Sequence, residues 1–211
     1  MIYIKNDSND PYFNQAFEEY VFEHFTPEED ILLLWINNPC LVCGRYQNLF
    51  QEVNLPEAAK RNIPIIRRNT GGGTVYHDRG NLNYTLIQAR EAEAPLDYGV
   101  FLAPVIEALN DMGVPAHQRN VCDIAINNLK ISGSAQNVKP DRVLHHGTLL
   151  FDANLADLKS LLRPAPGKME SKAVKSVPSP VTNIKEHFTG RGYADVNEFA
   201  KALKTALIGQ N

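Results

Sequence analysis

The spacing of hydrophobic and polar positions changes several times along the chain between a helical and a strand period. Apolar side chains that recur every three or four residues predict amphipathic helices over residues 9–24, 97–112 and 195–207. The apolar repeat of the first helix is Phe13, Phe17, Tyr20 and Val21. Asp10 and Pro11 stand where a capping residue and a first-turn proline belong, and Gly113 follows the second helix as a C-terminal glycine. The sequence therefore marks the ends of these helices as well as their apolar faces.

Shorter apolar runs predict strands between the helices. We expect strands over residues 31–36, 40–44, 63–67, 81–87, 124–126, 129–132 and 143–151, and short helices over 56–61 and 155–162. Residues 81–87 alternate leucine and tyrosine with asparagine and threonine, which is typical of a half-buried strand. The stretch 164–180 is rich in proline, lysine and serine and predicts a mobile loop. Strands interspersed with helices indicate a mixed α/β or α+β fold class.

Composition narrows the class of protein. A chain of 211 residues with 44% hydrophobic and 21% charged side chains suits a compact globular domain. It has no apolar run of the roughly 20 residues that span a bilayer and does not start like a signal peptide, so we expect a cytoplasmic protein. A formal net charge of −3 gives no general attraction to nucleic acid or to an anionic membrane. The three cysteines include a CxxC pair with no second pair to complete a zinc site, and we expect reduced thiols.

Three consecutive glycines follow two arginines in the segment RRNTGGGTVYH, residues 67–77. Without Cβ atoms, the amides of Gly71, Gly72 and Gly73 can approach a ligand and point several N–H groups at one anion. The neighbouring Arg67 and Arg68 are planar donors that suit phosphate. The segment matches neither a P-loop nor a GxGxxG turn. On its own it predicts a phosphate or carboxylate site, and a flexible hairpin with surface arginines is the alternative.

A second segment, DIAINNLKISGSAQ, surrounds one lysine with small residues. The pair Asn127-Asn128 tolerates the positive φ of a tight hairpin, so Lys130 lies just past the bend. An inward Lys130 could hold the charge of a carboxylate and a phosphate together, beside the small residues 132–135. A solvated lysine at a turn is the alternative interpretation.

A third segment, HHGTLL, places two histidines in a predicted strand. His145 and His146 then point to opposite faces and cannot bind one metal ion together. One of them is a candidate for a pocket, and core packing or surface exposure is the alternative.

Taken in order, five segments resemble the lipoate-protein ligase family: GRYQN, RRNTGGGTVYHD, KISGSAQ, HHGTLL and SKAVKSVPSPVTNI. This family is similar to biotin protein ligases and to octanoyl- and lipoyl-transferases. The resemblance covers nearly the whole chain and implies a mixed β-sheet flanked by helices. It also implies an ATP-dependent enzyme that converts lipoic acid to lipoyl-AMP and then transfers the lipoyl group to a lysine. The implied acceptors are lipoyl domains, namely the E2 subunits of 2-oxoacid dehydrogenases and the glycine cleavage H protein, and the implied cofactors are ATP and Mg²⁺.

The same resemblance implies roles for individual residues. Lys130 would be the catalytic residue, placed between carboxylate and α-phosphate. The nucleotide and adenylate phosphate would contact Arg68, Gly73, Thr74, Val75, Tyr76, Lys130 and Asp123. Asp123 would also hold magnesium. Lipoate would be bound by Gly71, Gly72, His77, Ser134, His146 and Gly147.

The chain departs from the family pattern near its proposed centre. Two extra residues separate Asn120 from Asp123 and bring Cys122 beside the site. Some relatives are ATP-independent acyltransferases with a nucleophilic loop cysteine, so an octanoyl or lipoyl transferase that uses Cys122 is the rival enzyme hypothesis. Pro178 and Pro180 stand where some relatives carry other residues, including arginine, which weakens the prediction of charged adenylate contacts there.

The domain prediction has two parts. Residues 1–190 are expected to form the lipoate- and ATP-binding catalytic domain, and residues 191–211 a C-terminal helix that starts the connection to a small further domain. Without that domain, a non-catalytic lipoate-binding module is the second alternative.

Overall fold

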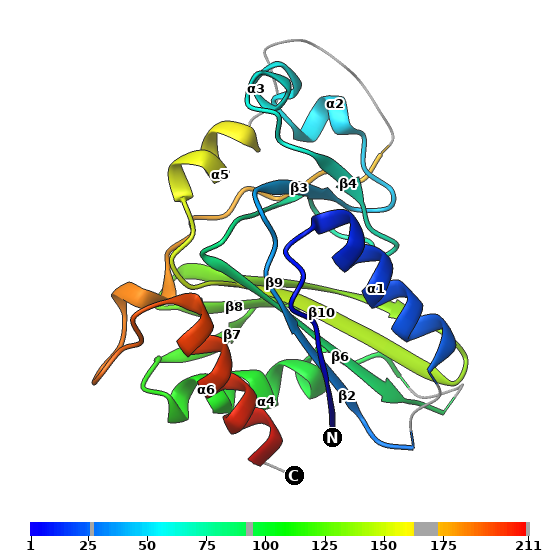
Figure 1. Cartoon of the computed structure of the whole chain (residues 1–211), viewed down its shortest axis with the longest axis vertical. Helices are drawn as coiled ribbons and strands as arrows, with labels where there is room; N and C mark the ends of the chain where they lie inside the picture. The colour runs from blue at the N-terminus through cyan, green and yellow to red at the C-terminus, as the bar shows by residue number, and fades with distance from the viewer. Residues whose placement is uncertain (26–27, 92–94, 163–172, 210–211) are drawn as a thin grey trace.

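The computed structural model describes residues 1–25, 28–91, 95–162 and 173–209, and two β-sheets organise these residues (Figure 1). The larger sheet has the order β1-β2-β6-β10-β9-β8-β7 and the smaller one β4-β3-β5. The strands of the larger sheet are β1 (Ile2–Lys5), β2 (Ile31–Trp35), β6 (Asn81–Ala89), β7 (Ala116–Arg119), β8 (Asp123–Ile126), β9 (Leu129–Val138) and β10 (Arg142–Leu150). The smaller sheet contains β3 (Cys40–Cys43), β4 (Ile65–Arg67) and β5 (Val75–His77). The expected mixed sheet flanked by helices is confirmed.

Strand β2 explains why the larger sheet is covered on both faces. Its sequence ILLLW is buried at every position. Leu32 and Leu34 pack in one core cluster with helices α4 (Tyr98–Asp111) and α6 (Val196–Gly209). Ile31, Leu33 and Trp35 pack in another with Val21 and Phe22 of helix α1 (Pro11–His24). A strand with helices on both faces is a continuous apolar run because neither set of alternate side chains reaches water.

Helix ends follow the signals in the sequence. The Asp10 carboxylate accepts hydrogen bonds from the backbone N–H groups of Tyr12 and Phe13, as an N-cap does. Gly113 follows α4 with a φ of +85°, a conformation that glycine adopts without steric cost. Helix α6 buries Val196, Phe199, Leu203 and Leu207 in the same core cluster as α4.

The predicted apolar face of α1 is wrong in part. Phe13 and Tyr20 are more than half exposed, whereas Asn14 and Glu18 are buried beside Val21 and Phe22. The two polar side chains are tolerated inside because hydrogen bonds from other elements satisfy them, as described below.

The smaller sheet forms a second layer with helices α2 (Leu49–Glu52), α3 (Leu55–Lys60) and α5 (Leu155–Leu161). Its core cluster contains Leu41, Val53, Ala58, Tyr76 and Leu161. The strands predicted over 31–36 and 40–44, β2 and β3, belong to different sheets although they are close in sequence. The chain between them therefore passes from one sheet to the other. Residues 70–74, here called the glycine segment, and β5 contribute to the lining of a crevice between the two layers.

Strand β6 is buried along nearly its whole length, so the prediction of a half-buried strand is wrong. Asn81, Asn83 and Thr85 are at most 2% exposed. On their face of the sheet, Thr85 contacts Glu18 of α1 and Asn83 lines the crevice. Polar alternation here marks a face built for hydrogen bonding.

Residues 173–183 cross the crevice as an extended strap and lead to the short helix η1 (Ile184–Glu186). The expected mobile loop over 164–180 overlaps residues 163–172, which lie outside the described residues. The described part, 173–180, has no helix or strand. The residue that follows it, Val181, forms a parallel β-bridge with Lys130.

Gly80, in the turn before β6, gives a first prediction. A Cβ atom at this position would lie 2.0 Å from the backbone oxygen of Asp152, and backbone cannot swing away as a flexible side chain can. We expect Gly80→Ala to lower the free energy of unfolding by about 1–3 kcal/mol, measured by urea denaturation. The control is Gly190→Ala, where nothing lies within 4 Å of the added atom. Equal stability of the two variants would contradict the argument.

Candidate active site

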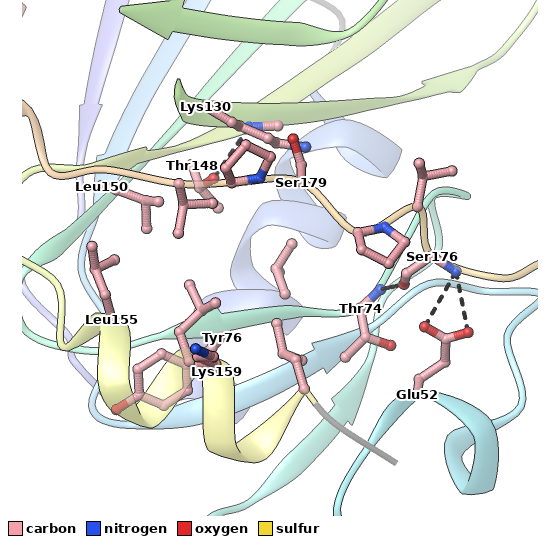
Figure 2. A pocket seen from close by; sticks show the side chains of 18 of the residues that line it. Glu52, Thr74, Tyr76, Lys130, Thr148, Leu150, Leu155, Lys159, Ser176 and Ser179 are labelled. Carbon is pink, nitrogen blue, oxygen red and sulfur yellow. Dashed lines mark hydrogen bonds between the residues drawn. The ribbon is translucent and has the colours of Figure 1, made fainter. Parts of the chain in front are cut away.

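Two cavities share part of their walls, including residues of the strap, and Figure 2 shows the first of them. The first cavity, about 1090 Å³, is bounded by β5, α5 and the strap, with Tyr76, Leu150, Leu155, Leu158 and Lys159 in its wall. The second cavity, about 860 Å³, lies between the larger sheet and the glycine segment, with Trp35, Val42, His77, Ala135 and His146 in its wall. Both cavities are lined by Thr74, Val75, Lys130, Gly133, Thr148 and strap residues 175–180. A molecule in one cavity would thus meet a molecule in the other at this common wall.

Lys130 holds the strap at one end through its backbone. Its N–H donates to the Pro180 oxygen at 2.9 Å, and its own oxygen accepts from the Thr182 N–H at 3.0 Å. Arg119 donates to the Ser179 hydroxyl in the same region. The strap is thereby an added parallel partner of β9 at the position of the lysine.

Ser176 holds the other end of the strap. Its hydroxyl oxygen accepts from the Thr74 backbone N–H at 3.1 Å and from the Gln47 amide at 3.0 Å, and its own N–H donates to the Glu52 carboxylate at 3.2 Å. Figure 2 shows Ser176 between Thr74 and Glu52. The backbone N–H of Thr74, which follows the three glycines, is bonded to the Ser176 hydroxyl of the strap. The strap and the glycine segment therefore form one surface.

The Lys130 side chain enters the common wall as part of a charge cluster. Its Nζ lies 2.6 Å from Asp123 Oδ1, and Arg119 lies 3.3 Å from Asp123 Oδ2. A Cβ at Gly133 would stand 2.7 Å from the Lys130 Nζ, so the glycine leaves the space that the ammonium occupies. Lys130 has three N–H donors, and the bond to Asp123 leaves two of them for a ligand.

The Arg68 guanidinium holds the glycine segment in place. It donates to the backbone oxygens of Gly71 and Gly73 at 2.5 and 2.7 Å, and also to the Val42 oxygen and the Thr70 hydroxyl. Arg68 is 6% exposed, and burial lowers its pKa to about 10, so it stays charged at neutral pH. Four donated bonds fix the shape of the loop.

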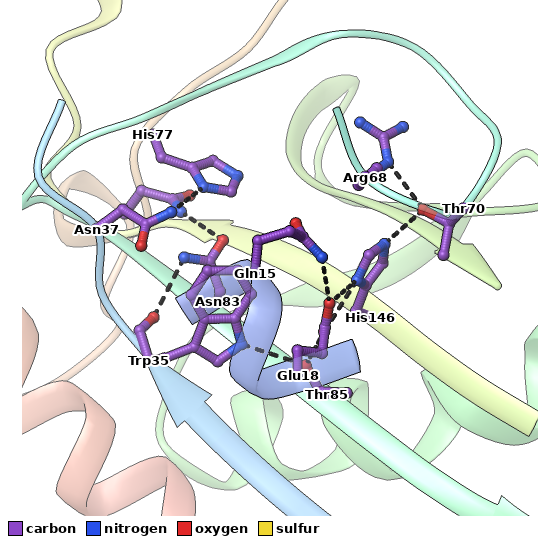
Figure 3. Close-up of polar contacts among 11 residues, drawn as sticks. Gln15, Glu18, Trp35, Asn37, Arg68, Thr70, His77, Asn83, Thr85 and His146 are labelled. Atoms are coloured by element: carbon purple, nitrogen blue, oxygen red, sulfur yellow. Dashed lines mark hydrogen bonds and ion pairs between the residues drawn. The ribbon is translucent and has the colours of Figure 1, made fainter. Parts of the chain in front are cut away.

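A buried acid lies behind this arginine (Figure 3). The Glu18 carboxylate contacts His146 Nδ1 at 3.0 Å, and His146 Nε2 lies 2.8 Å from the Thr70 hydroxyl that Arg68 also contacts. Burial alone would raise the pKa of Glu18, but the charge and hydrogen bond of His146, together with bonds from Thr85 and Gln15, lower it. The negative charge of Glu18 acts in turn to raise the pKa of Arg68, so the buried acid favours the charged guanidinium.

His77 lies deep in the second cavity and is 4% exposed. Asn37 Nδ2 contacts its Nδ1 at 3.1 Å, and the Trp35 ring meets it edge-on with centroids 6.1 Å apart. Burial and the charge of Arg68 lower the pKa of His77 to about 3, so the ring is neutral.

Comparison with known proteins identifies the family. Residues 10–208 match the family model described as the lipoyl protein ligase A/B catalytic domain. The chain belongs to this family. It is 40% identical over its whole length to the lipoate-protein ligase LplJ of Bacillus subtilis, and 36% identical over 97% of its length to lipoate-protein ligase 1 of Staphylococcus aureus. It spans 63% and 62% of the length of these two relatives. The crystal structure of Plasmodium falciparum LipL1 in complex with lipoate matches 100% of this chain and 63% of that one, with a TM-score of 0.81 and 26% identity.

The residues that the ligase resemblance singles out gather around the two cavities. Lys130, Thr74 and Val75 line both, and Tyr76 lines the first only. The second cavity alone is lined by Arg68, Gly72, Gly73, His77, Asp123, Ser134, His146 and Gly147. Gly71 appears in neither wall, and its oxygen accepts from Arg68. Arg68, Gly73 and Asp123, which were expected to contact the nucleotide, thus line the same cavity as most of the residues expected to bind lipoate, and the contact roles of all these residues stay predictions.

Several residues of this ligase-family site escaped the sequence analysis. Gln15, Trp35 and Asn83 line the second cavity, Glu52 lines the first, and Glu18 lies behind His146. Gln15 and Glu18 stand in a segment that reads as an ordinary amphipathic helix. Two features of the sequence could have pointed to them: polar residues at every second position of 81–85, and an acidic residue, Glu18, within the apolar repeat of the first helix. Periodicity alone does not show whether such polar residues face solvent or a buried site.

Three smaller predictions can be compared with the structure. His145 packs against Phe101 inside the core while His146 faces the second cavity, which confirms opposite faces. All three cysteines are free thiols. Within the described residues, no helix is long and apolar enough to cross a membrane, and no group of three acidic, histidine or cysteine side chains could hold a metal ion by itself.

The two buried histidines predict a loss of stability in acid. His77 and His145 have pKa values lowered by burial from 6.5 to about 3. Below about pH 6.5 the unfolded chain binds a proton at each, whereas the folded chain does not until about pH 3. The free energy of unfolding should therefore fall as the pH drops from 6.5 to 5, by up to about 1.4 kcal/mol per pH unit for each histidine.

Urea denaturation at pH 7.0, 6.0 and 5.0 measures this dependence. His77→Asn should reduce the slope by one histidine's share, and His117→Asn, at an exposed position, serves as the control. An unchanged slope in His77→Asn would show that His77 is not a neutral group in the folded protein.

Proposed function

We propose that this chain is the catalytic domain of an ATP-dependent lipoate-protein ligase, which makes lipoyl-AMP and transfers the lipoyl group to a lysine of a lipoyl domain in the cytoplasm. The single observation that carries the proposal is the position of Lys130 in a wall common to two cavities. Two substrates that react with each other must be held side by side, and a positive charge at their junction can stabilise the negative charge that moves between them. The names of the bacterial relatives support the choice of lipoate.

In this proposal the first cavity receives ATP. Its wall offers Tyr76 and leucines of α5 for an aromatic base, and Lys159 and Lys175 for phosphate charge. The second cavity receives lipoate, because Trp35, Val42 and Ala135 give it an apolar interior while its outer end reaches Lys130. Arg68 then acts by shaping the glycine segment between them.

Lys130 acts in the first chemical step. The lipoate carboxylate attacks the α-phosphorus of ATP, the bond to the β-phosphate oxygen breaks, and pyrophosphate leaves. Negative charge moves from carboxylate to phosphate oxygens during this attack. A lysine ammonium that already holds Asp123 and has two free N–H donors stabilises the charge on both sides of the reacting atoms, which lowers the barrier.

The second step needs only access and orientation. The amine of the acceptor lysine attacks the lipoyl carbonyl, an amide forms, and AMP leaves. The strap lies along both cavities, so the mixed anhydride would be covered by residues 175–180 while it waits for the acceptor. Exclusion of water protects such an intermediate from hydrolysis.

A magnesium ion fits the common wall when ATP supplies most of its ligands. Asp123 is a buried carboxylate of the second cavity that contacts Lys130 in the common wall, and hard divalent ions bind carboxylate and phosphate oxygens. Asp123 would hold the ion, which would neutralise phosphate charge. Arg119 and Lys130 would keep the carboxylate oriented.

Cys122 does not favour the rival transferase. Burial and the Asp123 carboxylate, 3.8 Å from its sulfur, raise the pKa of the Cys122 thiol. A cysteine nucleophile needs the opposite shift, because the thiolate is the reactive form.

Replacement of Lys130 tests the proposed centre. We expect Lys130→Ala to slow lipoyl-AMP formation by at least about 100-fold, since it removes a charge at the reacting atoms. Adenylate formed from lipoate and Mg-ATP is measured by mass spectrometry, and Lys201→Ala on the exposed side of α6 is the control. Adenylate formation at the wild-type rate by a folded Lys130→Ala protein would remove Lys130 from its role. Lipoate binding by the wild type without pyrophosphate release would instead support a non-catalytic module.

Transfer to an acceptor separates ligase from transferase. Lipoylation of a purified lipoyl domain should require Mg-ATP and should persist within about threefold in Cys122→Ser, because the thiol takes no part in charge stabilisation. Mass spectrometry of the acceptor gives the readout. ATP-independent transfer from an acylated carrier protein, lost in Cys122→Ser, would establish the transferase.

A further inference from the structure

His77 Nε2 is a buried polar atom without a hydrogen-bond partner among the described residues. It belongs to the inner end of the second cavity, where Trp35, His77 and Asn83 are at most 5% exposed. The opposite end is the mouth, where Val121 and Val177 are 65% and 87% exposed. Since buried polar groups are nearly always satisfied, an unpaired ring nitrogen beside a cavity indicates a ligand atom.

A chain of asparagines decides which atom of the ring carries the proton. The Asn14 amide nitrogen faces the backbone oxygens of Ser8 and Ile36 at 3.0 and 3.3 Å, which fixes its orientation. It therefore donates to Asn37 Oδ1, at 2.8 Å. Asn37 must then present its own Nδ2 to His77 (Figure 3).

An N–H group facing His77 Nδ1 makes that ring atom an acceptor. The ring is neutral, because burial lowers its pKa to about 3, so its one proton is on Nε2. The unpaired atom is thus an N–H donor on β5, held in a fixed direction by two asparagine side chains, Asn14 of α1 and Asn37 between β2 and β3.

We propose that His77 Nε2–H donates a hydrogen bond to a sulfur of the dithiolane ring and makes the enzyme prefer lipoate to a saturated acyl chain of the same length. This inference rests on the proposed function. A thioether-like sulfur is a weak acceptor, whereas the methylene groups of octanoate accept nothing and would leave the donor unsatisfied. Trp35, edge-on to His77, supplies the aromatic contact that divalent sulfur also favours.

The decisive probe is a carbon analogue of lipoate. In 5-cyclopentylpentanoate, methylene groups replace both sulfurs while the five-membered ring and the chain length stay the same. Calorimetric titration of the whole chain with lipoate, 5-cyclopentylpentanoate and octanoate compares their Kd values. We expect lipoate to bind roughly three- to tenfold more tightly than the carbon analogue. A tenfold difference corresponds to about 1.4 kcal/mol, which is the upper end of what a weak hydrogen bond contributes.

Two variants of His77 separate the donor from the asparagine contact. His77→Asn can still accept from Asn37 but lacks a group at the Nε2 position, so lipoate and its carbon analogue should bind equally. His77→Gln keeps an N–H near the Nε2 position and should retain part of the preference. A role of His77 in folding alone would alter all three affinities together and leave their ratios unchanged.

Nitrogen-15 NMR of histidine-labelled protein measures the tautomer directly. A proton on Nε2, with Nδ1 unprotonated, is the expected result, and its resonance should shift with lipoate but not with octanoate. A proton on Nδ1, or equal affinity of the wild type for lipoate and 5-cyclopentylpentanoate, overturns the inference while leaving the proposed ligase intact. If none of the three acids binds with or without Mg-ATP, the proposed function fails as well.

Discussion

The burial of one positive charge organises the crevice between the two sheets. Arg68 has almost no contact with water, and a buried guanidinium is stable only when its donors are used and its charge is balanced. Backbone oxygens of the glycine segment accept from its donors, and the negative charge of Glu18 favours its charged form. Contacts from Arg68 to Thr70, from Thr70 to His146 and from His146 to Glu18 link the two charged groups. α1, the glycine segment and β10 are therefore fastened to one another at the point where the second cavity forms.

The strap lines both cavities. It is anchored at Lys130 by backbone pairing and at Thr74 by the hydroxyl of Ser176, so its ends depend on the two segments that form the common wall. The same contacts that position the strap also fix the lysine backbone. A reaction between two bound molecules is thus confined to one place, next to the Lys130 and Asp123 pair.

The inner end of the second cavity differs from its mouth in the charge of the side chains that line it. Towards the mouth lie the charged side chains of Arg119, Asp123 and Lys130. In the proposed reaction they stabilise the negative charge that moves between the reacting groups. At the inner end, His77 is neutral and its direction is set by Asn14 and Asn37, which suits recognition instead of catalysis. Asn14 of α1 and Asn83 of β6, two polar residues that break the apolar pattern, belong to this inner end.

The local elements and the segments that carry chemistry could be predicted from the order of residues alone. Caps at Asp10 and Gly113, the hairpin at Asn127 and the glycine run are local features, since backbone conformation and short-range hydrogen bonds depend on neighbouring residues. Motif order also sufficed to indicate the family. Three features became visible only in the folded chain: β2 and β3 lie in different sheets, Glu18 and Asn14 are buried, and Arg68 holds the glycine segment. These outcomes depend on partners far apart in the chain, because a polar side chain is buried or exposed according to which distant group completes its hydrogen bonds.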